Sequence, residues 1–168
     1  FKINIKIDQT YLDQKNIINN LKGYLIYSDN EIYESKLESS FSNNKKIRFT
    51  INTDNGVKIT TLYTDIAKPF VDRYKFIKGF EEGNLDFYST KKNNISNSIL
   101  KIDNFKVQEV PILAKLLTLA SLQGIADLLT GEGIRFTDFE MKFSNQKKLM
   151  KIEEMYAIGP AISILLDG

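Results

Sequence analysis

Paired carboxylates are the residues of this chain whose types and spacing could do acid–base chemistry. The pairs are Glu81–Glu82, Glu153–Glu154 and Asp138–Glu140. A glycosidase needs two carboxyl groups facing one another across a sugar. Adjacent residues of a strand point to opposite faces, so the two Glu–Glu pairs fail this requirement locally. Asp138 and Glu140 share a face, but the solvated side of a strand explains them more simply, and we assign no catalytic residue.

The amino-acid composition excludes several other kinds of site. The 168 residues include no Cys and no His, which rules out disulfides, thiolate or imidazole metal sites and His-based catalysis within them. Gly131-Glu132-Gly133 precedes a strand pattern, so it indicates a helix exit rather than a phosphate loop. We therefore expect no enzyme activity, no cofactor and no metal.

Length and charge narrow the class of protein further. The chain has 23 basic and 21 acidic residues, a net charge of +2, and this balance predicts no nucleic-acid partner. Its length suits one domain or part of a larger protein. It begins at Phe1 in a strand pattern and ends after another, so we expect residues 1–168 to be a single segment of a larger protein.

Most of the sequence has the alternating pattern of half-buried strands. Residues 1–8 alternate apolar and polar side chains, and Ile47, Phe49 and Ile51 share one face of a later strand. Asn55-Gly56 is a strong hairpin signal because both positions tolerate a positive φ. The predicted strands cover residues 1–8, 21–27, 31–39, 47–53, 57–64, 84–90, 99–107, 134–145, 149–158 and 161–166.

Two segments favour helices instead. Asp65 can cap a helix over about residues 65–77, in which apolar residues recur at helical spacing. A longer apolar helix is predicted over about residues 111–130, with Pro111 in its first turn and Gly131 after its end. This helix could pack on a sheet, or it could expose a second face to lipid or to a partner. A helix that spans a bilayer is the least favoured alternative, because Lys115 and Asp127 interrupt the apolar run.

These elements together predict the fold class. We expect a mainly β protein with two helices, of the α+β class. Short turns between consecutive strands favour a curved, mostly antiparallel sheet that forms an open groove, with the long apolar helix near its C-terminal part.

The C-terminal part of the sequence resembles a known protein family. The segments Val110–Ile134, 134–143 and Met155–Gly168 are similar to the C-terminal region of AsmA-like envelope proteins, in particular the YhdP-like branch of alphaproteobacterial type. The first half fits more loosely, through its hairpin and the Gly79–Leu85 segment. That resemblance implies a bridge-like protein anchored in the inner membrane by a segment outside this chain, with a β-sheet in the periplasm along which phospholipids move.

The function expected from this resemblance is phospholipid transport to, or homeostasis of, the outer membrane. Phospholipid acyl chains are the expected partners, with the outer-membrane surface or other envelope proteins as further partners. The alternative is a non-catalytic structural or partner-docking module of the cell envelope. The residues expected to contact lipid are Ile112, Leu113, Leu116, Leu117, Leu119, Leu122, Ile47, Phe49 and Ile51.

Overall fold

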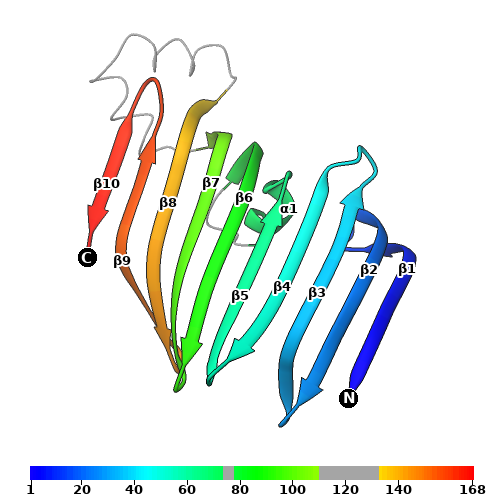
Figure 1. The fold of residues 1–168 in the computed structure, drawn as a ribbon. Helices are drawn as coiled ribbons and strands as arrows, with labels where there is room; N and C mark the ends of the chain where they lie inside the picture. Colours follow the sequence, from blue (N-terminus) through cyan, green and yellow to red (C-terminus); the bar gives the residue numbers. More distant parts are fainter. Residues whose placement is uncertain (74–77, 110–132) are drawn as a thin grey trace.

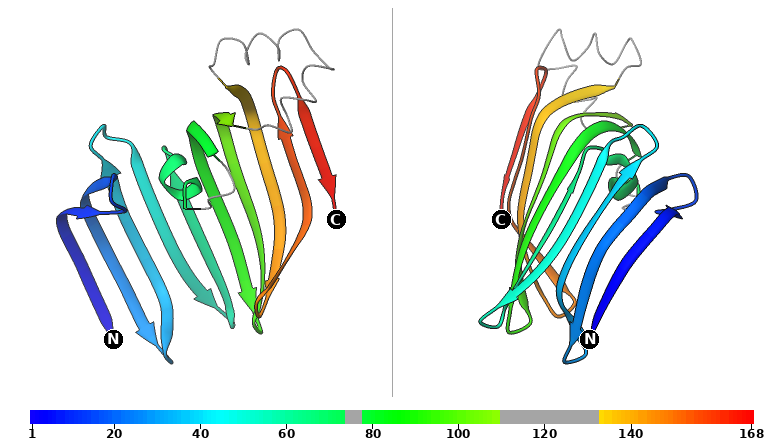
Figure 2. Two further views of the ribbon diagram at one scale, coloured as in Figure 1. Left: turned by 180° about the vertical axis from the view of Figure 1, so that it is seen from behind. Right: turned by 45° about the vertical axis from the view of Figure 1, so that its right-hand side comes forward.

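A computed structural model describes residues 1–73, 78–109 and 133–168 of the protein. In this part of the chain ten strands form one sheet, and their order in the sheet is their order in the sequence (Figures 1 and 2). Every neighbouring pair is antiparallel. The strands are β1 (Lys2–Tyr11), β2 (Ile17–Ser28), β3 (Glu31–Phe41), β4 (Lys46–Asp54), β5 (Val57–Thr64), β6 (Lys78–Lys92), β7 (Ile95–Glu109), β8 (Ile134–Gln146), β9 (Leu149–Ile158) and β10 (Ser163–Asp167).

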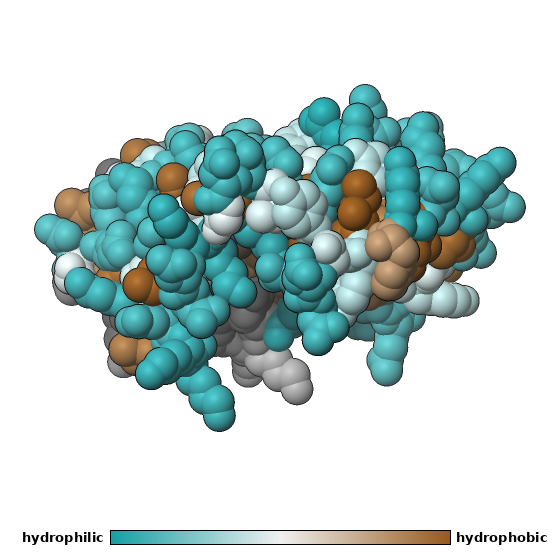
Figure 3. Space-filling view, turned by 60° about the horizontal axis from the view of Figure 1, so that its bottom comes forward, coloured by the Kyte–Doolittle hydropathy of each residue, from teal (hydrophilic) through white to brown (hydrophobic). Residues whose placement is uncertain are grey.

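Tight turns at one end of the sheet fix the pairing of consecutive strands. Asn55 and Gly56 join β4 to β5 with φ angles of 50° and 73°, and Asn93 and Asn94 join β6 to β7 with 50° and 65°. Positive φ at two successive positions matches the right-handed twist of the flanking strands. Figure 3 shows that this end of the molecule has a mostly hydrophilic surface with separate hydrophobic patches.

The main core lies on one face of the sheet, over β6, β7 and β8. Phe80 and Ile134 are each 1% exposed, and the short helix α1 (Lys68–Val71) contributes buried Val71. Figure 2 shows α1 lying against one side of the sheet. The buried members of this cluster are Ala67, Val71, Phe80, Leu85, Ile102, Phe105, Val107, Ile134, Phe136 and Ala157.

The helix expected over residues 65–77 is wrong in its extent. The described part of that segment contains only α1, which has four residues and no side-chain cap. Asp65 does not cap it, because its carboxylate accepts the Lys46 backbone N–H at 2.8 Å and the Tyr63 hydroxyl at 2.6 Å. The chain then enters β6 at Lys78, six residues before the strand start expected at Asn84.

The predicted fold class, mainly β with two helices, is also wrong. The described residues form an all-β structure, a single antiparallel sheet whose one helix in these ranges is the four-residue α1. The long apolar helix expected over residues 111–130 lies outside the described residues. Within the described ranges, no helix has the length and apolar character needed to cross a membrane.

Candidate functional site

The two faces of the sheet differ sharply in chemistry. Residues paired across neighbouring strands point to the same face, so the pairing register shows which side chains form a row. One row crosses all ten strands. This central row consists of Ile5, Gly23, Leu37, Phe49, Leu62, Phe87, Leu100, Met141, Met155 and Leu166.

The central row is an almost unbroken apolar line from one edge of the sheet to the other. Gly23 is its one member without an apolar side chain. Most of its side chains are half-buried, and Leu166 at the β10 edge is 44% exposed. Among the described helices and strands, α1 covers part of this face: it contacts β6, and its Phe70 packs against the buried cluster of Ile18, Phe41 and Ile47. We call the side of the sheet that carries the central row the apolar face.

The neighbouring rows of the apolar face have different characters. Toward α1, the next row is largely apolar and includes buried Ile47, Leu85 and Ile102. On the other side of the central row, hydroxyl groups occur at Thr60, Ser89 and Ser98. The Ser98 hydroxyl is buried and donates to Ser89 at 2.9 Å. The apolar face therefore has a short polar strip across β5, β6 and β7, on one side of its central row.

The opposite face carries charged and polar side chains at the positions next to the central row. Apart from Leu165 on β10, every member of this row is charged or polar: Lys6, Lys22, Glu38, Arg48, Tyr63, Asp86, Lys101, Glu140, Tyr156 and Leu165. We call this side the polar face. A sheet with one apolar and one solvated face is typical of antiparallel strands whose residues alternate.

Ion pairs on the polar face involve three of the six carboxylates considered as catalytic candidates: Glu82, Glu140 and Glu154. The carboxylate oxygens of Glu140 lie 2.9 Å from the Lys101 Nζ and 3.5 Å from the Lys142 Nζ. The hydrogen bond from Lys101 holds the pKa of Glu140 below its ordinary value. Lys142 also binds Glu154 at 2.8 Å. Glu82 pairs with Lys106 at 3.2 Å, and that hydrogen bond lowers its pKa. These carboxylates are ion-pair partners of lysines.

Among the other three candidates, Asp138 stands opposite Asp103 on the neighbouring strand. Asp103 accepts a hydrogen bond from Asn84 at 3.1 Å. Asp138 itself is exposed. Within residues 1–73, 78–109 and 133–168, no group of three or more acidic side chains is placed to hold a metal ion.

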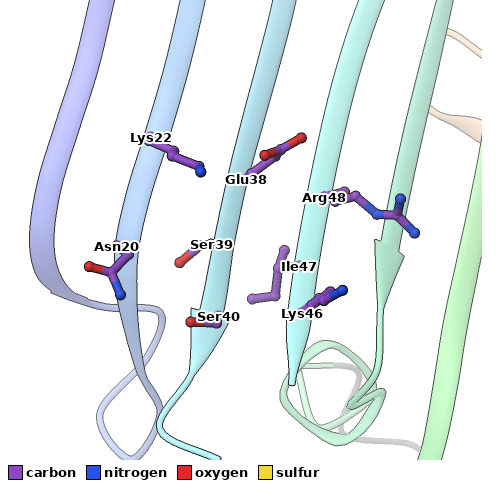
Figure 4. A pocket seen from close by; sticks show the side chains of 8 residues that line it. All are labelled: Asn20, Lys22, Glu38, Ser39, Ser40, Lys46, Ile47 and Arg48. Carbon is purple, nitrogen blue, oxygen red and sulfur yellow. The ribbon is translucent and has the colours of Figure 1, made fainter. Parts of the chain in front are cut away.

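A shallow hollow of about 350 Å³ lies over β2, β3 and β4 (Figure 4). Lys22, Lys46 and Arg48 are its cations, and Glu38 is its carboxylate. Figure 4 shows these side chains spread over three strands rather than converging on one point. All three cations are exposed, so the hollow has the character of a solvated surface.

The structure places part of the expected lipid-contacting set on the apolar face. Phe49 belongs to the central row, and Ile47 and Ile51 flank it on the same strand, 8% and 9% exposed. The other expected residues lie outside the described part of the chain: Ile112, Leu113, Leu116, Leu117, Leu119 and Leu122.

Of the central row, the sequence analysis predicted only Phe49 as a lipid-contacting residue. Leu62, Phe87 and Leu100 each lie in segments with a strand pattern, and that alternation was the available signal for their faces. The sequence does not show that they stand side by side. That information is in the strand register, which pairs Leu62 with Phe87 and Phe87 with Leu100.

Comparisons of the chain with models of protein families, with curated proteins and with solved structures find no match.

Proposed function

We propose that this chain binds phospholipid acyl chains on its apolar face, as a periplasmic segment of a bridge-like protein anchored in the inner membrane by a segment outside the chain. In this proposal the protein takes part in phospholipid transport to, or homeostasis of, the outer membrane. One observation supports it above the others: the central row crosses all ten strands without a charged side chain. The membrane assignment rests on the resemblance to AsmA-like proteins.

The dimensions of the central row suit an acyl chain. Adjacent strands lie about 4.8 Å apart, so a row across ten strands extends for about 43 Å. The hydrocarbon core of a bilayer is about 30 Å thick, and one acyl chain therefore spans about 15 Å. The row is longer than its ligand, so an acyl chain can move along it while keeping apolar neighbours.

The energetics favour such movement. Burial of each CH₂ group contributes about 0.8 kcal/mol, and the contribution is non-directional. A lipid moving across the strands exchanges one apolar side chain for the next, for example Leu62 for Phe87. The hydroxyl groups of Thr60, Ser89 and Ser98 lie along one side of this path, where the ester groups of a phospholipid can face them.

Site-specific photocrosslinking tests this proposal with size-matched controls. A photoreactive phenylalanine replaces Phe49 or Phe87 on the apolar face, and Tyr63 or Tyr88 on the polar face. All four positions are aromatic, so each substitution is conservative. The purified chain is irradiated with vesicles of phosphatidylethanolamine and phosphatidylglycerol, and adducts are identified by mass spectrometry.

We expect phospholipid adducts at positions 49 and 87 and background levels at positions 63 and 88. Equal yields on the two faces, or no lipid adduct at any position, would overturn the proposal. Crosslinking the same variants in cells of an expression host separates it from the alternative. Protein adducts on the apolar face without lipid would replace lipid carriage with a partner-docking role.

A further inference from the structure

The apolar face becomes polar in steps toward the end of the sheet where Asn93 and Asn94 join β6 to β7. Side chains of one face recur at every second residue of a strand. Two residues beyond the central row lies the polar strip of Thr60, Ser89 and Ser98. Two residues further, on the same face, a row of charged and polar side chains crosses β4 to β8. This turn-end row consists of Thr53, Lys58, Lys91, Ser96 and Asn145.

The turn-end row places two cations directly opposite one another. Lys58 on β5 pairs with Lys91 on β6, and like charges in this position destabilise a strand pair. Among the described residues, one carboxylate compensates them: Glu31 forms an ion pair with Lys58. The hydrogen bond from Lys58, with a smaller contribution from the charge of Lys91, lowers the pKa of Glu31. This part of the apolar face therefore carries excess positive charge.

A hollow of about 440 Å³ lies beside Lys91, at the ends of β6, β7 and β8. Its cations are Lys91 and Lys147, and no described carboxylate lines it. Its other lining residues are neutral and carry hydrogen-bond donors: Asn93, Asn94, Ser96, Asn145 and Gln146. Ammonium, amide and hydroxyl groups are donors that suit phosphate oxygens. The hollow over β2, β3 and β4 differs, because Glu38 stands between two of its cations.

We propose that the hollow beside Lys91 binds a phosphate group. Lys91 and Lys147 compensate the charge of the phosphate, and Ser96 and Asn145 donate hydrogen bonds to its oxygens. The phosphodiester of a lipid headgroup and a soluble phosphate present the same chemistry. The choice of a lipid rests on the proposed function, since an acyl chain in the central row brings its headgroup toward this hollow.

The spacing of the rows suits a phospholipid whose acyl chain lies in the central row. Successive rows of one face are about 6.7 Å apart along a strand. The polar layer on each side of the hydrocarbon core of a bilayer is about 5–8 Å thick. With the ester groups at Ser89 and Ser98, the phosphate therefore lies one row further, at Lys91 and Ser96. The central row then accepts any acyl chain, and the hollow adds a preference for lipids that carry a phosphate.

A competition between two lipids tests the phosphate site separately from acyl-chain binding. Phosphatidylglycerol and diacylglycerol with identical acyl chains are presented in equal amounts in micelles of a non-ionic detergent. The photoreactive phenylalanine at position 87 records which lipid occupies the central row, and mass spectrometry gives the ratio of the two adducts. We expect this ratio to favour phosphatidylglycerol roughly tenfold, because diacylglycerol lacks the phosphate that the lysines bind.

Matched lysine variants locate the origin of the preference. Lys91→Gln with Lys147→Gln removes both cations of the hollow and should abolish it. Lys92→Gln with Lys148→Gln is the control, because these lysines are the next residues in the chain and do not line the hollow. The control should keep the preference, and far-UV circular dichroism verifies that both variants are folded. Equal adduct yields from the unchanged chain, or an equal loss in both variants, would overturn the phosphate site and leave acyl-chain binding intact.

A soluble ligand distinguishes the two sources of phosphate. Glycerophosphoglycerol, which has no acyl chain, is titrated into the unchanged chain while NMR follows the amide signals of Ser96 and Asn145. Shifts that Lys91→Gln with Lys147→Gln abolishes, without any lipid adduct at position 87, would retain the phosphate site and overturn lipid carriage. Neither shifts nor lipid adducts would overturn both proposals.

Discussion

Removal of the Phe105 ring should cost far more stability than removal of a ring from the central row. Phe105 is 5% exposed, and its ring stacks between those of Phe80 and Phe136, with centroids 5.2 Å away on each side. Phe139 meets it edge-on at 6.4 Å. A buried Phe→Ala change costs about 3–5 kcal/mol, and each aromatic pair adds about 0.5–1.5 kcal/mol beyond its buried area. Phe105→Ala should therefore lose about 4–5 kcal/mol.

Phe49→Ala is the matched control on the same face. Phe49 is half-buried, so its truncation should cost about 2 kcal/mol. Urea unfolding measures the loss of stability of both variants. Far-UV circular dichroism follows the unfolding, because the chain has no Trp whose fluorescence could report it. With a slope of about 2 kcal/mol per M, the midpoint should fall by about 2 M for Phe105→Ala and about 1 M for Phe49→Ala. Equal shifts, or a larger shift for Phe49→Ala, would refute the assignment of the core to the stacked rings over β6, β7 and β8.

The remaining predictions concern the ion pairs and a backbone bulge. Glu140→Gln should cost about 1 kcal/mol at pH 7, since Lys101 and Lys142 are about half exposed, at 54% and 42%. Folding lowers the pKa of Glu140, so the ionised carboxylate stabilises the folded state at pH values above the ordinary Glu pKa, and this stabilisation is lost as pH falls below about 4.3. A difference in unfolding free energy between Glu140→Gln and the unchanged chain that persists at acid pH would contradict this. Gly83→Ala should cost about 2 kcal/mol, because φ is +77° and a Cβ would lie 3.0 Å from the Phe105 Cβ. Gly56→Ala, at φ +73° with nothing within 4 Å of the added Cβ, should cost only about 1 kcal/mol, and urea unfolding measures both variants. Equal costs for the two glycine variants would contradict the steric argument.

Local sequence patterns located parts of the strands and several of the turns. The alternation in residues 1–8 corresponds to the start of β1, and Asn55-Gly56 is the β4–β5 turn. Such patterns are readable because side chains of a strand alternate between faces, and because only certain residues accept a positive φ. For Ile47, Phe49 and Ile51, the sequence was also sufficient to predict a shared face.

The same reasoning was wrong about the extent of the first helix and about the start of β6. The apolar spacing of residues 66–77 resembles a helix, and Gly79 resembles its end. In the structure Gly79, Glu82 and Gly83 have positive φ within β6, which therefore bends while it continues to pair with β7. β6 begins at Lys78, directly after the segment expected to be helical, and no feature within that segment announces the pairing with β7.

The sequence by itself determined which residues alternate, where the chain turns and which chemistries are impossible without His or Cys. Only the tertiary structure decided that apolar side chains from nine of the ten strands, with Gly23 from β2, align in one row. A shift of one residue in any pairing would move a strand's apolar side chains to the other face. That alignment depends on bulges and on hydrogen bonds between strands, such as the register shift between Asn19 and Lys22. These interactions join residues far apart in the chain, so the continuous apolar face is a property of the folded sheet.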